Sequence, residues 1–575
     1  MAPRGKLPIF HCVPVPSNHA SPEIFLPYVF KTDVMIAAIS HQHFRKAFRL
    51  AGVTGICLWI FNISCVEKKA GPPAQLLNEL QLKKGEIISC GKDLQYGSVE
   101  FEIPCSEPIK QDFNLGMELL HSFEYDEAEK VFAAIIDKEP DCSMAYWGIA
   151  MCNLHLLWTA PSYSELKKGA DALIIAKKFT HPQGRELDYI DALNEYYKDW
   201  QNPDWETRNL HLEKAMERLS RKYPGDKEAS ILYALSLVAA ANPMDKTYEK
   251  QKKAGSILNA LYIGQPDHPG ILHYIIHAYD YPGLASQALT QARRYAAIAP
   301  ASAHALHMPS HIFTRLGLWD ESILSNLASV AAAKCYAESA GIKGHWDEEL
   351  HSMDYLVYAW IQQGKIEEVR KQLEYLDTIE TVYPVNFKTA YAFAAMPARY
   401  MLEQRNWQGA RNLRIHPAVF PWKNFPWQEA IFHFARLLGA ARLGDLDSAR
   451  GALVKLQNLH DILDAQGDSY KARQVEIQCL TGEAWIAFRF GSKVKGLSKM
   501  KRAADMEDST EKHPVTPGEV IPARELLASM LLEMNEPQQA MEAYQRALNK
   551  SPNRRNALLG IHEAELMIRK ASSKR

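Results

Sequence analysis

The sequence predicts an all-α fold built from repeated pairs of helices. Small residues recur at 34-residue intervals at Ala254, Ala288 and Ser322, and a small residue at this position lets the second helix of a pair pack closely on the first. Pro266 and Pro300 are also 34 residues apart and close two of the repeats. Because one such unit cannot bury its apolar face alone, we expect the units to stack on one another.

Both ends of the predicted helical region contain a more specific sequence pattern. The stretch FNLGMELLHSFEYDEAEKVFAAIIDKEP contains small, aromatic and proline residues at characteristic offsets, and ARELLASMLLEMNEPQQAMEAYQRALNKSP repeats them near the C-terminus. This pattern resembles the tetratricopeptide repeat (TPR) family. The resemblance implies a right-handed superhelical solenoid over residues 109–570, with a concave groove lined by the first helix of each repeat. The matching residues are Gly116, Tyr125, Ala128, Phe132 and Pro140, then Ala540, Tyr544, Ala547 and Pro552.

Charge and composition exclude one class of partner. The 575 residues include 66 Lys and Arg against 67 Asp and Glu. The sequence contains no long basic run with interleaved aromatic residues, which is the pattern that follows a phosphate backbone. We therefore expect no binding to nucleic acid.

The N-terminal segment is typical of an export signal. The apolar run LAGVTGICLWIFNI is shorter than the roughly 20 residues that span a bilayer. Basic residues precede it and Cys65 follows it, which predicts a signal peptide over residues 35–65. Its end resembles the lipobox of bacterial lipoproteins, in which Cys65 would be acylated, although Asn62 stands where that family prefers Leu.

This signal sequence predicts a lipoprotein of the bacterial cell envelope, which is held to the membrane only by its lipid. The signal begins late, so Met35 competes with Met1 as the true start, and residues 1–34 are a doubtful leader or a mis-assigned start. The alternative is a cytoplasmic protein in which the apolar run is a buried helix.

Residues 66–108 are expected to form a linker and a short β-like segment. Val99, Phe101 and Ile103 alternate with polar residues, as in a strand with one buried face. Cys90 and Cys105 flank this segment, and a disulfide between them is reasonable in an oxidising compartment. Two free thiols packed under the first repeat are the alternative.

Histidines gather between Asp267 and Trp319. His273 and His277 are four residues apart, as are His307 and His311, and the second pair follows the first by 34 residues. Side chains at this spacing share one face of a helix. The TPR resemblance places both pairs on the groove side, together with further residues of neighbouring repeats: His304, His351, Asp354, Tyr358 and Arg399.

Imidazoles at this spacing suit Zn or another transition metal. We expect His273, His277, His307 and His311 to converge on one ion, with Asp280, His351 or Asp354 as supporting residue or general base. Tyr-Ile-Ile separates the first pair, so no H-E-x-x-H metalloprotease motif is present. Pro309 should interrupt the helix that carries the second pair.

Three functions follow as hypotheses. The first is an exported, lipid-anchored scaffold that binds a protein or peptide partner in its histidine-rich groove. The second is a metal-dependent enzyme, hydrolytic or oxidative, and the third is a glycan-capture lipoprotein. The stretch HALHMPSHIFTRLGLW, with ELHSMDYLVYAW, also resembles a group of bacterial TPR-containing proteins with the motif HAxHMPSHIFxRLGxW. That resemblance implies the fold and supplies no activity.

Overall fold

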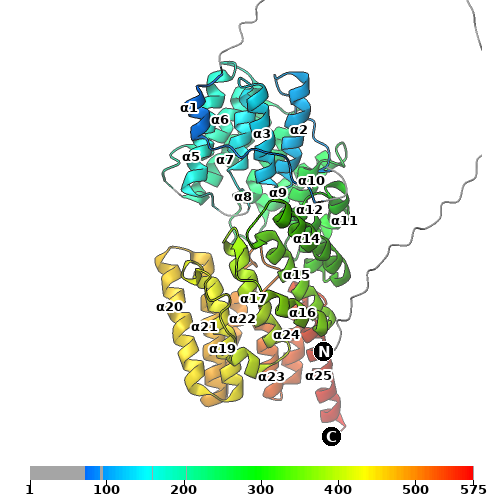
Figure 1. Cartoon of the computed structure of the whole chain (residues 1–575). Coiled ribbons are helices and arrows are strands. Elements are labelled where there is room, and N and C mark those ends of the chain that lie inside the picture. Colours follow the sequence, from blue (N-terminus) through cyan, green and yellow to red (C-terminus); the bar gives the residue numbers. More distant parts are fainter. Residues whose placement is uncertain (1–70, 91–94, 158–159, 203, 574–575) are drawn as a thin grey trace, which may run out of the picture. The chain divides into compact units, whose positions relative to one another are not determined.

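The computed structural model describes residues 71–90, 95–157, 160–202 and 204–573 (Figure 1). The predicted signal peptide and Cys65 lie outside these residues and stay predictions. The chain divides into the unit 1–68 and the unit 69–575, and only the second is described. Among the described residues, no helix is both long and apolar enough to cross a membrane.

The described residues confirm the all-α class, with helices that follow one another along almost the whole unit (Figure 1). The first half contains α1 (Ala74–Glu79), α2 (Glu107–His121), α3 (Tyr125–Lys138), α4 (Ser143–Cys152), α5 (Tyr163–Phe179), α6 (Arg185–Tyr197), α7 (Trp205–Lys222), α8 (Lys227–Ala239), α9 (Glu249–Tyr262), α10 (Pro269–Tyr279), the 3-10 helix η1 (Ala285–Ala288), α11 (Leu289–Ile298), α12 (Ala303–His307) and α13 (Pro309–Leu316).

The second half continues in the same way with longer helices. It contains α14 (Trp319–Ser339), α15 (Asp347–Gln363), α16 (Ile366–Leu376), α17 (Phe387–Glu403), α18 (Trp407–Arg411), the 3-10 helix η2 (Trp422–Asn424), α19 (Pro426–Leu443), α20 (Leu446–Ala465), α21 (Ser469–Phe490), α22 (Lys493–Asp508), α23 (Ala523–Glu533), α24 (Pro537–Lys550) and α25 (Arg555–Ser572). The strands β1 (His345–Trp346) and β2 (Val382–Tyr383) form one short parallel pair.

Small residues allow the helix pairs to approach, as the repeat pattern predicts. Ala254, Ala288 and Ser322 are each fully buried. In the first pair, a Cβ added to Gly116 on α2 would lie 2.7 Å from the Phe132 ring on α3. Such a distance is too short for a real contact, so the packing of α2 on α3 requires glycine at this position.

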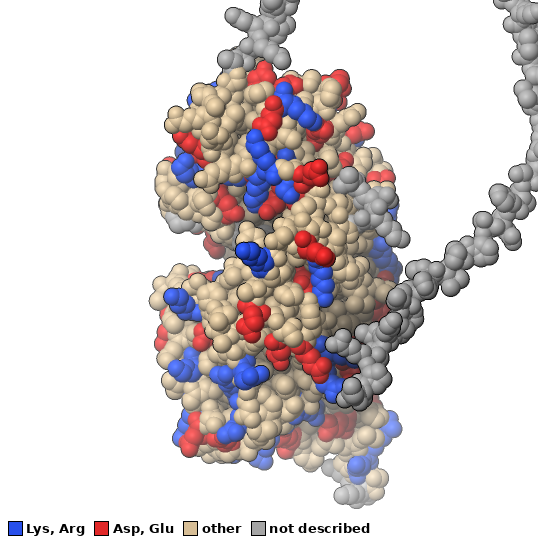
Figure 2. Space-filling view, viewed as in Figure 1, with Lys and Arg blue, Asp and Glu red and all other residues tan. Residues whose placement is uncertain are grey.

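Two large apolar cores stabilise the described helices. One extends from Leu80 to Phe313 and the other from Trp319 to Ala557. The C-terminal residues return to the middle of the array, because the Trp319 indole donates to the Asn553 carbonyl at 3.1 Å. On the face that Figure 2 shows, Lys and Arg are interspersed with Asp and Glu, in keeping with the balanced charge.

The expected β-like segment is extended but is not a strand. Val99, Phe101 and Ile103 are buried between exposed neighbours, so the predicted alternation is correct. Side chains of α2 take the place of a partner strand: the Val99 amide donates to Glu118 at 3.2 Å and the Phe101 amide to Asn114 at 3.0 Å. The strand prediction is wrong because helix side chains satisfy this backbone.

The disulfide pairing also differs from the prediction. Cys90 is bonded to Cys335 on α14, and Cys105 is bonded to Cys142 at the start of α4. The expected Cys90–Cys105 bond is therefore wrong. Sequence proximity favoured that pair, whereas packing brings each cysteine to a different helix, with 5.8 Å between the Cα atoms of each bonded pair.

Candidate metal centre

Four helices carry six histidines into the interior. His273 and His277 lie on α10, and His351 lies on α15. The chain between them is divided at Pro309, as predicted, so that α12 ends at His307 and α13 begins immediately after Met308. The remaining histidines of the group, His304, His307 and His311, lie on these two short helices.

The first triad consists of His273, His277 and His304. The Nε2 atom of His273 lies 3.1 Å from that of His277 and 3.2 Å from that of His304. His273 is fully buried and His304 is 3% exposed, while His277 is half-buried. Three ring nitrogens thus converge on one point from two helices.

Hydrogen bonds on the opposite side of the rings fix the tautomers of two members of the first triad, His273 and His304. The His273 Nδ1 lies 2.7 Å from the carbonyl oxygen of His121, which can only accept. The His304 Nδ1 lies 3.2 Å from a carboxylate oxygen of Glu348. Both Nδ1 atoms therefore donate, and in a neutral ring the facing Nε2 atoms carry lone pairs.

The second triad consists of His307, His311 and His351. The Nε2 atoms of His307 and His311 are 3.0 Å apart, and the His351 ring centroid lies 4.3 Å from that of His307. The candidate ligand atoms within each triad all lie within 4.8 Å of one another. All three rings of this triad are buried.

The tautomers of His307 and His311 in the second triad are fixed in the same way. The His307 Nδ1 lies 2.7 Å from Asn326 Oδ1, and the Asn326 amide donates to Ser322, which identifies that oxygen as an acceptor. The His311 Nδ1 donates to Asp280 at 3.0 Å. The Nε2 lone pairs of His307 and His311 therefore also face each other.

Facing lone pairs at this distance repel unless a cation lies between them. Two nitrogens that bind one ion at about 2.0–2.1 Å with tetrahedral angles are about 3.3–3.4 Å apart, close to the observed spacing. Burial lowers the pKa of His273, His307 and His311, so protons do not supply that cation at neutral pH. These three rings are therefore neutral imidazoles, which is the form that binds metal.

A third cluster has the same residue types but different chemistry. His121 and His268 both donate from Nε2 to the Glu228 carboxylate, at 3.1 and 2.6 Å. The Nδ1 of His121 accepts from Tyr274 and that of His268 accepts from the Ile271 amide. Every ring nitrogen is satisfied without an ion, so this cluster is a buried hydrogen-bond network that supports the first triad.

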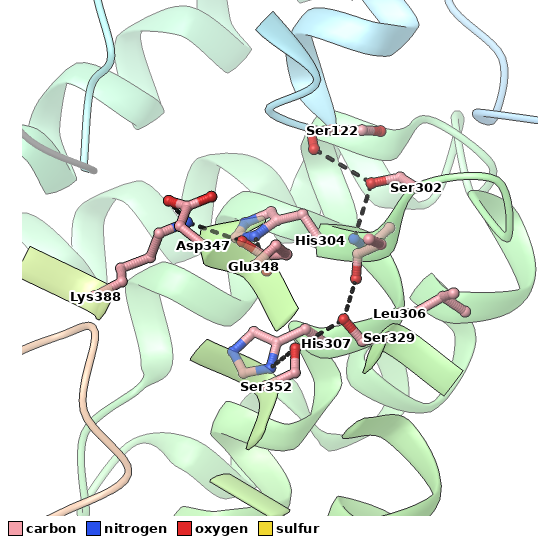
Figure 3. A network of polar contacts seen from close by, with 12 residues as sticks. Ser122, Ser302, His304, Leu306, His307, Ser329, Asp347, Glu348, Ser352 and Lys388 are labelled. Atoms are coloured by element: carbon pink, nitrogen blue, oxygen red, sulfur yellow. Dashed lines mark hydrogen bonds and ion pairs between the residues drawn. The ribbon is translucent and has the colours of Figure 1, made fainter. Parts of the chain in front are cut away.

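Charged side chains surround the two triads. Lys388 contacts Asp347 at 2.7 Å and Glu348 at 3.0 Å, and Glu348 in turn holds His304 (Figure 3). Burial by itself would raise the pKa of Glu348, but the adjacent Lys388 and His304 outweigh it and lower the pKa well below the usual value. Glu348 is therefore a carboxylate that orients its histidine.

Asp280 has the equivalent role for the second triad. Besides His311, it binds Arg315 at 2.8 Å and Lys512 at 2.9 Å. These cations lower the pKa of Asp280 against the opposing effect of burial. Asp280, one of the candidate bases predicted from the sequence, therefore fixes the orientation of His311.

The histidines are enclosed and do not line an open groove. The segment 509–522, between α22 and α23, covers the second triad, where the Tyr355 hydroxyl contacts His311 Nδ1 at 3.2 Å and donates to the Thr516 carbonyl at 3.0 Å. Phe123 stacks on His304 with ring centroids 5.3 Å apart. The expected groove-facing histidine surface is filled by these side chains and this loop.

The other predicted groove residues belong to a separate polar cluster. Asp354 forms a buried ion pair with Arg399, whose guanidinium lies 5.0 Å from the Tyr358 ring centroid. The Tyr358 hydroxyl accepts a hydrogen bond of 2.8 Å from Arg554. Asp354 is thus committed to an arginine, which disfavours the suggested role as general base at the histidines.

The sequence prediction identified the four paired histidines but not their grouping. The expected single group of four is instead divided between two triads, and the His277 and His311 ring centroids lie 6.2 Å apart. The missing members are His304 and His351. The sequence signal for His304 was its position three residues before His307, which also lies on the same helical side.

Fold and site together define a class: an all-α helical-repeat protein with two adjacent, buried histidine triads. Comparison with known proteins adds no family to this description, since neither a protein-family model nor a curated protein matches the chain.

Solved structures give only distant likenesses. A monomeric mutant of IFIT1 with Gppp-AAAA is 12% identical, with 82% of this chain and 99% of that chain covered and a TM-score of 0.32. The TPR domain of P58(IPK) is 12% identical, with 81% of this chain and 100% of that chain covered and a TM-score of 0.18. Aspartyl phosphate phosphatase F from Bacillus subtilis is 12% identical, with 78% of this chain and 95% of that chain covered and a TM-score of 0.23. These TM-scores are too low to show a shared fold. The evidence for a helical-repeat architecture is the helix pairing described above.

Proposed function

We propose that the protein binds two transition-metal ions, one in each histidine triad. The observation that carries this proposal is the convergence of Nε2 lone pairs, at 3.2 Å between His273 and His304 and at 3.0 Å between His307 and His311. Each of these rings is held from its Nδ1 side by a fixed acceptor. Orientation of a ligand ring by such an outer partner is usual in protein metal sites.

The donor set restricts the metal and its chemistry. Six imidazoles with no thiolate among them suit Zn, Cu, Fe or Ni and disfavour Mg or Ca, which prefer oxygen ligands. Three protein ligands leave a coordination position open for water or substrate. Such a centre supports metal-dependent hydrolysis or oxidation, with Asp280 and Glu348 as orienting carboxylates.

The metal content of the protein tests the proposal directly. The full chain, purified without chelators and analysed by inductively coupled plasma mass spectrometry, should hold two ions. His273→Ala and His307→Ala should each leave one ion, and the double variant should leave none, because each substitution opens one triad.

His433→Ala provides the matched control, since His433 is buried on α19 and belongs to neither triad. This variant should keep both ions. A wild-type protein without stoichiometric metal, which also takes up none of Zn, Cu, Fe or Mn when these are added, would contradict the proposal.

Binding of a peptide or protein remains a second proposal, at a different place. A small hollow of about 40 Å³ is lined by residues that include Tyr391, Trp427, Gln478, Thr481 and Glu519. Among the described residues, Gln478 Oε1 and Thr481 Oγ1 have no hydrogen-bond partner although they are buried. These two atoms favour a partner segment that presents donor groups there, and they separate such a partner from the histidines.

Export and lipid anchoring complete the proposal. The sequence ahead of Cys65 supports export to the bacterial cell envelope. Two disulfides add support, because such bonds form and persist mainly in oxidising compartments. The same address would suit glycan capture, but Trp422 and Trp427 are buried and offer a sugar no exposed aromatic platform.

A further inference from the structure

The two triads are close enough to act as one centre. The His277 and His311 ring centroids are 6.2 Å apart, and those of His304 and His307 are 6.3 Å apart. The rings of different triads therefore contact each other, and ions bound by them would be neighbours. This inference rests on the proposed binding of two metal ions.

The charges around the centre restrict the ions further. Three carboxylates, Asp280, Asp347 and Glu348, are paired with three cations, Arg315, Lys388 and Lys512. All six side chains are buried. These six side chains together thus supply no net negative charge, and the imidazoles supply none.

Buried charge without compensation is costly. Two divalent ions alone would add four positive charges to this interior, whereas two monovalent ions would add two. Among the metals that imidazole binds, copper is the one with a common monovalent state. Divalent copper would restore the same total charge only together with a bridging dianion.

We propose that the triads hold a pair of copper ions that binds dioxygen between them. Each Cu(I) gives one electron to dioxygen, which becomes a bridging peroxide dianion while both ions become Cu(II). No proton or further reductant takes part. The total charge of metals and ligand is two positive before and after the step, so the buried site meets no new charge.

Burial restricts the ligand to a small molecule. Five of the six rings are at most 4% exposed, and only His277 is half-buried. Phe123 packs on the first triad and residues 509–522 cover the second. A diatomic molecule fits such an enclosure, while a larger substrate would first require this loop or ring to move.

Oxygen uptake and spin coupling test the inference. The full chain is loaded with Cu(I) under anaerobic conditions to two ions per chain and then exposed to dioxygen. We expect one dioxygen consumed per two copper ions. The oxidised protein should show an electron paramagnetic resonance signal at least tenfold below its copper content, because neighbouring Cu(II) spins couple through a bridge.

Variants separate one centre from two independent sites. His304→Ala and His351→Ala should each bind one copper, which is visible by paramagnetic resonance once it is oxidised, and should lose the uptake of one dioxygen per two ions. His351→Gln is made alongside because it retains much of the side-chain volume if the alanine variant does not fold. His433→Ala should behave like the wild type.

The outcomes are distinct. Two bound ions without oxygen uptake, or two fully visible Cu(II) ions per chain, would overturn this inference and leave the metal-binding proposal intact. Failure to bind any metal would overturn both.

Discussion

At the residue scale, the partner of one ring nitrogen decides what a histidine can do. In the two triads four of the six Nδ1 atoms face acceptors, namely the His121 carbonyl, Glu348, Asn326 and Asp280. In the neighbouring cluster, His121 and His268 accept at Nδ1 and donate from Nε2 to Glu228. The same residue type is thus prepared for a metal in one place and for a carboxylate in the other.

Asn326 offers a selective test of this orienting role. Asn326→Leu keeps a similar volume but removes the acceptor of His307 Nδ1. We expect the metal affinity of the second triad to fall by about 10–100-fold, with the first triad unaffected. Titration of the metal-free protein against a chromophoric chelator measures both sites.

Two substitutions control for a general loss of stability. Asn326→Asp keeps an acceptor and should retain most of the affinity. Asn153→Leu changes another buried asparagine, whose amide donates to the Ile149 carbonyl at 2.8 Å, and should leave both sites intact. Equal weakening of both triads by Asn326→Leu would show that the effect is not orientation.

At the element scale, helix pairing rests on positions where a side chain is excluded. Gly116 and Gly148, on α2 and α4, both face Phe132 of α3, with distances of 2.7 and 2.6 Å from an added Cβ to that ring. One phenylalanine thus fills the space that two glycines leave on the helices at either side. The predicted repeat pattern has a direct packing reason here.

Gly116→Ala tests that packing. The added methyl group would overlap the Phe132 ring, so we expect the free energy of unfolding to fall by about 1–3 kcal/mol in urea denaturation. Phe132→Leu introduced together with it should recover part of the loss, since the smaller side chain makes room.

Gly451 is the matched control, because it lies exposed in the middle of α20 with nothing within 4 Å of an added Cβ. Gly451→Ala should raise the free energy of unfolding by about 0.5–1 kcal/mol, as alanine is the better helix former. A loss of the same size in both variants would contradict the packing explanation.

At the scale of the whole molecule, covalent bonds join distant parts of the described unit. The Cys90–Cys335 bond links residues 245 positions apart, and the Cys105–Cys142 bond links residues 37 positions apart. A cross-link over a longer loop restricts the unfolded chain more. Both bonds presuppose an oxidising environment, which is the environment that export would provide.

Labelling in bacterial cells tests the predicted address. When cells that express the full chain are grown with a palmitate analogue, the protein should incorporate the label at Cys65. Cys65→Ser should abolish labelling because serine cannot form the thioether, whereas Cys479→Ser, at a buried free cysteine, should not change it. Equal labelling of the wild type and Cys65→Ser would contradict lipidation at this residue.

Much of the fold could be predicted from the sequence because its signals are local. The 34-residue recurrence of Ala254, Ala288 and Ser322 reflects helix contacts within single repeats, and all three residues are buried as expected. The helix break at Pro309 follows from the missing backbone donor. The predicted strand at Val99 is not formed. Alternating apolar residues indicate one buried face of an extended segment, but they do not indicate which groups accept its backbone hydrogen bonds.

The candidate metal site could be predicted from the sequence only in part. The sequence by itself set the two histidine pairs, since residues four apart share a helical face in any α-helix. Only the tertiary structure decided that His304 and His351 complete two triads, that Asn326 and Asp280 fix the rings, and that residues 509–522 enclose them. These contacts join separate helices, and their geometry depends on how the repeats stack, which no local spacing records.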